Sequence, residues 1–298
     1  MADTDIITAA TPHDELPVVR AITTDDLKDA LTRGWQDFLA MPTHVVFLSL
    51  IYPIVGITLG RAAFGLQLVP LLYPIATGFA LLGPFAAIGL YELSRRREMG
   101  LDTSWRHAFD IVHSPSFGSI LALGGLLVTI FCVWIGIAHA LYVANFGIQE
   151  PESLSQFARD VLTTPHGQAL AVAGNVSGFM FAVLTFSLSV VAFPLLLDRN
   201  VGIAVAIITS LKSVVKNPVT MTLWAAIVAG GLLLGSLPFL VGLAVVMPIL
   251  GHATWHLYRK VVEPDLSPRP AYEPRPRGKR YAAEFPASLF ASSKDEQS

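Results

Sequence analysis

Three histidines are spaced along the chain so that their imidazole rings could bind a metal ion. His252 and His256 are four residues apart, so they lie on one face of a helix, and His44 is expected near the same end of a neighbouring helix. Three imidazoles could bind zinc or copper, or ligate haem. The alternative is an aromatic belt at a membrane surface, beside Trp255 and Tyr258. We expect no cofactor, but the sequence leaves a metal or haem site open.

Polar side chains within one apolar stretch could form a path for a solute. Asn175, Ser177, Thr185 and Ser189 fall inside a run of apolar residues from 169 to 197. Amide and hydroxyl groups on one helix could line such a path, but single serines and threonines also bond to carbonyls of their own helix. Both interpretations remain open.

Two carboxylates end apolar runs and have arginine neighbours. Glu92 is followed by Arg95 and Arg96, and Asp198 is followed by Arg199. Buried carboxylates in membrane helices can carry protons or cations, but the neighbouring arginines favour ion pairs at the membrane surface. The sequence has no phosphate-binding loop, paired acid-base motif or nucleophile elbow. These features favour a protein that is not an enzyme.

The composition indicates what kind of protein must position these side chains. Of the 298 residues, 53% are hydrophobic and 14% are charged, and the mean hydropathy is +0.58. Soluble domains average about 25% charged residues. The charges also avoid the middle of every long apolar run. The chain is therefore predicted to be an all-α membrane protein with several spans.

The apolar runs predict six transmembrane helices. They cover residues 44–60, 68–93, 117–143, 169–197, 219–235 and 239–258. Together they make up a membrane domain of residues 23–260. Residues 1–22 and 261–298 are polar or rich in proline and charge, and are predicted to be disordered.

A proline ends an amphipathic stretch before the first, third and fifth predicted spans. The prolines are Pro42, Pro115 and Pro218. Four residues before each proline stand Phe38, Ile111 and Val214, and three residues before each stand Leu39, Val112 and Val215. This pattern predicts three repeats, each an amphipathic elbow helix in the membrane interface followed by a helical hairpin.

The first predicted elbow helix begins near Thr24. Leu27 and Phe38 fall on its apolar side, and Lys28 and Asp37 fall on the opposite side. The sequence therefore predicts that Asp37 faces away from the core.

Basic residues predict how the chain is oriented. If both termini lie on one side of the membrane, that side holds 18 of the 20 lysines and arginines, and the other side holds only Arg61 and Arg159. Cytoplasmic loops carry such an excess. Both termini and all three elbow helices are therefore expected to be cytoplasmic.

Three classes of function remain open. The first is a non-enzymatic membrane scaffold or accessory protein, and the second is a transporter or channel for a small solute. The third is a histidine-ligated metal or haem protein. The expected partner is the lipid bilayer, with anionic lipids contacted by the elbow helices and by the basic cluster from Arg275 to Arg280. A membrane-protein partner or a homo-oligomer remains open, and nucleic acid is not expected.

Short motifs around the third elbow resemble a known family. Phe193-Pro194-Leu195-Leu196-Leu197-Asp198, Ser210-Leu211 and Asn217-Pro218 are similar to the pattern of uncharacterised bacterial integral inner-membrane proteins, the domain of unknown function 2189. The resemblance covers about residues 19–262 and implies a location in the bacterial inner membrane. Some members are labelled cytochrome c oxidase subunit I-like. This sequence gives that label no support, because it has no adjacent pair of histidines.

Overall fold

The computed structural model describes residues 16–41, 53, 56–57, 69–148, 151, 153–237 and 241–265. The chain divides into two compact units, Met1–Glu263 and Pro264–Ser298, and all the features below belong to the first. The predicted first span, 44–60, lies almost wholly outside the described residues. The same is true of most of the two terminal segments.

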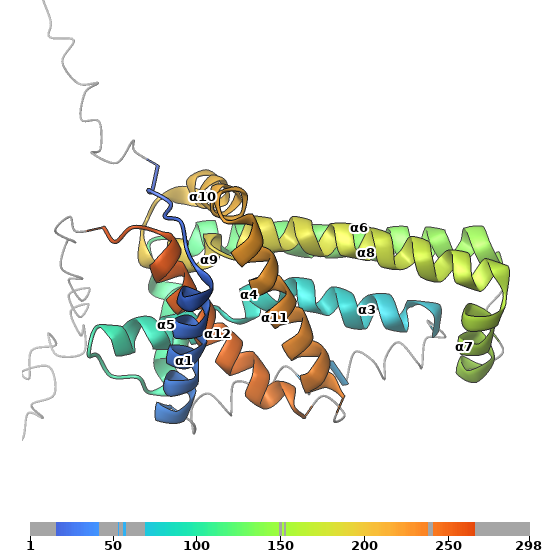
Figure 1. The fold of residues 1–298 in the computed structure, drawn as a ribbon, viewed down its shortest axis with the longest axis horizontal. Helices are drawn as coiled ribbons and strands as arrows, with labels where there is room; N and C mark the ends of the chain where they lie inside the picture. Colours follow the sequence, from blue (N-terminus) through green and yellow to red (C-terminus); the bar gives the residue numbers. More distant parts are fainter. Residues whose placement is uncertain are drawn as a thin grey trace, which may run out of the picture. The chain divides into compact units, whose positions relative to one another are not determined.

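The described residues are helical, and only one isolated antiparallel bridge, between Val19 and Val262, joins extended backbone. The elements before residue 115 are α1 (Thr24–Ala40), η1 (Val69–Leu71), α3 (Leu72–Phe79), η2 (Ala80–Leu82), α4 (Gly83–Ala86), α5 (Ile88–Glu98) and η3 (Trp105–His113). They are followed by α6 (Phe117–Phe146), α7 (Leu154–Thr163), α8 (Pro165–Ser189), α9 (Ala192–Asp198), α10 (Gly202–Lys216), α11 (Pro218–Ser236) and α12 (Leu243–Val261) (Figure 1). The predicted all-α class is confirmed.

Four helical segments are long and apolar enough to cross a membrane. They are Val69–Glu98, Phe117–Phe146, Pro165–Asp198 and Pro218–Ser236, and they correspond to the second to fifth predicted spans. Helix α12, at the predicted sixth span, is not one of them, because its C-terminal half carries His252, His256, Arg259 and Lys260. The count of six spans stays a prediction.

Prolines break two of these long segments. The segment Val69–Glu98 is divided into α3, α4 and α5 by the 3₁₀ element η2 and by a turn at Ala87. Pro84 lies in the first turn of α4, where its missing N–H costs least. The segment Pro165–Asp198 breaks between α8 and α9, three residues before Pro194. At this break the Val191 N–H donates to the Ser210 hydroxyl of α10, at 3.2 Å.

Helix α7 has no counterpart among the predicted elements. The Ser153 hydroxyl caps its N-terminus by accepting a hydrogen bond from the Gln156 N–H at 3.2 Å. The Phe157 ring packs against Tyr142 and Phe146 of α6, with centroid distances of 5.9 and 5.7 Å. These contacts fix α7 at the end of α6 that lies far from α10 (Figure 1).

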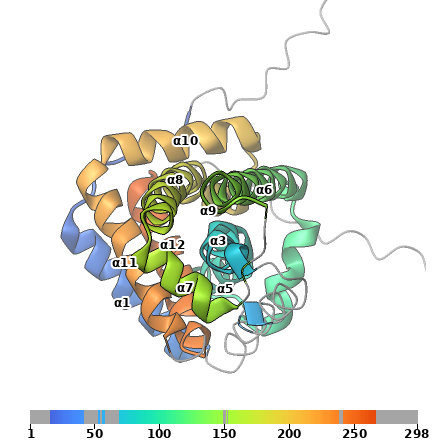
Figure 2. The same ribbon diagram turned by 90° about the vertical axis from the view of Figure 1, so that its right-hand side faces the viewer.

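Small residues allow α1 to pack closely on α12. A Cβ atom at Gly34 would lie 2.6 Å from the Cβ of Ala253, which is closer than two carbon atoms can approach. Figures 1 and 2 show the two helices side by side. This close approach brings the C-terminal part of α1 against the polar end of α12.

Candidate functional site

The carboxylate of Asp37 is buried where α1, α5 and α12 meet. Only 3% of the residue is exposed, so the predicted outward orientation is wrong. Its Oδ2 accepts hydrogen bonds from the Ser94 hydroxyl of α5 at 2.5 Å and from His256 Nε2 of α12 at 2.8 Å. Its Oδ1 pairs with the Arg97 guanidinium. At Asp37 the polar pattern of α1 therefore marks an interhelical contact and not a solvent-exposed position.

These contacts keep Asp37 ionised. Burial alone would raise the pKa of its carboxyl group, but the hydrogen bonds from His256 and Ser94 outweigh burial, so the pKa of Asp37 lies below its ordinary value. An ionised carboxylate can only accept hydrogen bonds. The Ser94 hydroxyl must therefore donate its proton to Asp37.

The direction of this bond also fixes the tautomer of His252. Its Nδ1 lies 2.6 Å from the Ser94 oxygen, and since the Ser94 proton is already donated, Nδ1 must carry a proton and donate it. In a neutral ring, Nε2 is then a buried acceptor, and the described residues offer it no donor. Ser94 and His252 are both fully buried, so no substrate can reach the serine. Asp37, Ser94, His252 and His256 thus form a buried cluster that joins α1, α5 and α12. This cluster is not a catalytic triad.

The structure brings two of the three predicted metal-binding histidines to one face of α12. His252 and His256 contact Ser94 and Asp37, whereas His44 lies outside the described residues. Among the residues that the structure describes, no group of three His, Cys, Asp or Glu side chains could hold a metal ion. The full histidine set, and with it a metal or haem, remains untested.

The aromatic neighbours of these histidines are buried inside the protein. Trp255 donates its ring N–H to Glu98 at 3.0 Å, and Tyr258 donates its hydroxyl to Asp198 at 2.8 Å. Both rings are therefore core residues that reach a carboxylate with their polar end.

Glu92 lies beside the two arginines that the sequence assigns to it. Arg95 Nε and Nη2 donate to the two Glu92 oxygens at 2.7 and 2.9 Å, and Arg96 lies 3.8 Å away. Such a paired geometry is the strongest that arginine and a carboxylate can form. The carboxylate is buried, so solvent screens this pair less than the sequence suggests.

Asp198 lies beside Arg199 and also beside a second arginine, which sequence reasoning missed. Arg199 Nε and Arg259 Nη1 each lie 3.5 Å from Asp198 Oδ2. Arg259 also donates to Glu98 at 3.0 Å, so it links α12 to α5 and α9. The position of these pairs relative to the membrane surface stays a prediction.

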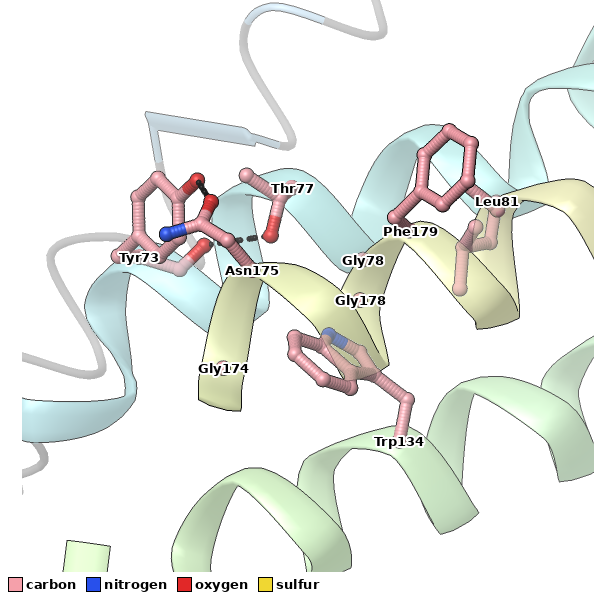
Figure 3. Close-up of a pocket in the computed structure, with 10 residues that line it drawn as sticks. Tyr73, Thr77, Gly78, Leu81, Trp134, Gly174, Asn175, Gly178 and Phe179 are labelled. Atoms are coloured by element: carbon pink, nitrogen blue, oxygen red, sulfur yellow. Dashed lines mark hydrogen bonds between the residues drawn. The ribbon is translucent and has the colours of Figure 1, made fainter. Parts of the chain in front are cut away.

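Of the four predicted path residues, Asn175 lines the cavity that the described residues form between α3, α6 and α8, and the other three do not line it. Asn175 faces a cavity of about 230 Å³ between α3, α6 and α8, where its Oδ1 accepts the Tyr73 hydroxyl at 2.8 Å (Figure 3). The Ser177 and Ser189 hydroxyls donate to carbonyls of their own helix, both at 2.6 Å, and Thr185 is buried. The polar path along all four residues stays a prediction.

The long apolar helices define the class of integral membrane proteins with several spans. Residues 71–198, from the end of η1 to the end of α9, match the model of a family described as predicted integral membrane protein (DUF2189). This is the family that the sequence resembles, and the match covers residues 71–198. No curated protein and no solved structure is significantly similar to the chain.

Proposed function

We propose that the protein is a non-enzymatic scaffold or accessory protein of the bacterial inner membrane, with both termini in the cytoplasm. In this proposal the three elbow elements α1, η3 and α10 lie in the cytoplasmic interface and hold the bundle there. They contact lipid directly, including anionic lipid, and present a surface to other membrane proteins.

One observation carries the proposal. At each elbow, the residue four positions before the proline packs against the core. The residue three positions before the proline is exposed. The packed residues are Phe38, Ile111 and Val214. The exposed ones are Leu39, Val112 and Val215, at 55%, 53% and 79%. Equivalent positions thus have equivalent surroundings, which supports the repeat and gives each elbow an outward apolar side chain.

The position of these apolar side chains favours contact with lipid. Val112 and Val215 stand five and three residues before the candidate spans that begin at Phe117 and Pro218, so both lie at the level where a helix enters the membrane. Trp35 on α1 and Trp105 on η3 are also exposed. Apolar and tryptophan side chains at this level insert into the boundary between headgroups and acyl chains.

A second candidate function is transport of a small solute, favoured by the cavity beside Asn175. The proposal of a scaffold is preferred because Ser177, Thr185 and Ser189 do not line that cavity. Flux of a small solute through the purified protein in liposomes, abolished by Asn175→Leu, would favour the transporter.

We expect spin labels at the three exposed positions to report an apolar environment. Cysteines would replace Leu39, Val112 and Val215 one at a time, in protein whose only cysteine, Cys132, is changed to alanine. In proteoliposomes, dissolved oxygen should relax these labels more strongly than a water-soluble nickel chelate, because oxygen concentrates in lipid.

Two exposed polar positions on the same helices serve as controls for the spin labels. Labels at Gln36 of α1 and Lys212 of α10 should be relaxed more strongly by the chelate. If labels at the apolar positions behave like these controls, the elbow elements do not insert into lipid and the proposed anchoring is wrong.

A further inference from the structure

We propose that the cavity between α3, α6 and α8 binds a lipid-soluble molecule with a single ring and a carbonyl oxygen. All three helices belong to candidate membrane spans. Tyr73 and Phe179, which line the cavity, are 59% and 69% exposed, so it opens to the outside of the helices. For membrane-spanning helices that outside is lipid, and a ligand would enter from the bilayer.

Glycines shape the cavity around one tryptophan. A Cβ atom at Gly78 would lie 2.7 Å from Trp134 Cδ1, and one at Gly178 would lie 3.1 Å from Trp134 Cη2. The indole ring therefore fits between α3 and α8 only because both positions lack a side chain (Figure 3). Its N–H donates to the Pro74 carbonyl at 3.0 Å, which fixes the ring as one wall of the cavity.

The polar groups of the cavity call for a ligand that accepts a hydrogen bond. Asn175 Oδ1 accepts from Tyr73, and its Nδ2 donates to the Ala171 carbonyl at 2.8 Å. An amide nitrogen carries two protons, and the second has no acceptor among the described residues. In apolar surroundings an unpaired N–H costs free energy, so a carbonyl oxygen on the ligand would stabilise it.

The size of the cavity is sufficient for a ligand with one ring. Its volume is about 230 Å³. An apolar protein cavity of about 150 Å³ can hold benzene, so one substituted ring fits here. The flat faces of Trp134 and Tyr73 are suited to such a ring.

The test uses the full-length protein in lipid nanodiscs and two radiolabelled probes. The first probe is 4-decylacetophenone, which has the ring and the carbonyl, and the second is decylbenzene, which lacks the carbonyl. Binding to empty nanodiscs is subtracted. We expect saturable binding of the ketone, with an affinity roughly tenfold higher than that of decylbenzene, as one hydrogen bond in a dry site provides.

Three variants make the test specific. At Gly174, which lines the cavity, a Cβ atom would meet nothing within 4 Å, so we expect Gly174→Leu to place its side chain in the cavity. This variant should lose saturable binding of both probes. Gly136→Leu, at an equally open position of α6 outside the cavity, should bind like the unchanged protein. Asn175→Leu should weaken binding of the ketone about tenfold and leave decylbenzene unaffected.

Thermal melting of each variant checks that it is folded. The proposal is overturned if the unchanged protein shows no saturable binding, or if Gly174→Leu binds the ketone as tightly as the unchanged protein does. Equal loss of both probes in Asn175→Leu would overturn the assignment of the carbonyl. None of these results depends on whether the elbow elements insert into lipid, so this site and the proposed scaffold function can fail separately.

Discussion

Replacing Asp37 by alanine is expected to destabilise the protein by about 3 kcal/mol. The change removes the acceptor of Ser94 and His256 and the ion-pair partner of Arg97. It leaves the buried Ser94 hydroxyl and the partly buried His256 ring without this partner. For a chain of this size we expect the midpoint of thermal unfolding in detergent to fall by roughly 6 to 12 °C.

A second aspartate on α1 provides the control for this substitution. Asp29 pairs with Lys260 and Arg33 at 2.9 Å each, but these pairs are partly exposed to solvent. Asp29→Ala should therefore cost less than about 1 kcal/mol. Equal unfolding midpoints for the two variants would show that the buried cluster around Asp37 does not stabilise the packing of α1 against α5 and α12.

Replacing Asn217 by alanine is expected to release the N-terminal segment and to cost about 2 to 3 kcal/mol. The Asn217 side chain is buried in the turn between α10 and α11, where its Oδ1 accepts the Ile22 N–H at 2.8 Å and its Nδ2 donates to the Arg20 carbonyl at 2.9 Å. Without it, the amide protons at the start of α1 should exchange with solvent much faster. Hydrogen exchange with mass spectrometry measures this effect.

Two further variants separate the parts of this contact. Asn217→Asp keeps an acceptor for Ile22 but loses the donor to Arg20, so it should have an intermediate effect. Asn200, exposed just before α10, is the matched control, and Asn200→Ala should leave exchange unchanged. Normal protection of Ile22 in Asn217→Ala would contradict the assigned role.

The ends of α1, η3 and α10 could be predicted because their signals are local. A proline after an amphipathic stretch ends a helix wherever the rest of the chain lies, and α10 accordingly ends just before Pro218. The break before Pro194 has the same cause. The signal for α7 was also present, since Ser153 caps its start and Thr164-Pro165 begins the next helix. It was missed because residues 145–168 are too polar to form a membrane span.

The buried cluster could not be predicted, because it depends on contacts between distant parts of the sequence. Asp37 and His256 are more than 200 residues apart, and the helical pattern of α1 alone places Asp37 on a polar face. The small residues Gly34 and Ala253 were the available signal, since they permit the close approach of α1 and α12. Nothing in the local pattern identifies the two as partners.

Topology mapping tests the central claim most directly, namely that the elbow elements gather at the cytoplasmic face of a membrane bundle. Reporter domains would be fused after Gly100, after Asn200 and after Gly147, each at the end of a candidate span. We predict that the first two reporters are cytoplasmic and that the third, at the end of α6 beside α7, is on the opposite side. Reporters at Gly100 and Asn200 on opposite sides, or at Gly147 on the same side as both, would contradict it.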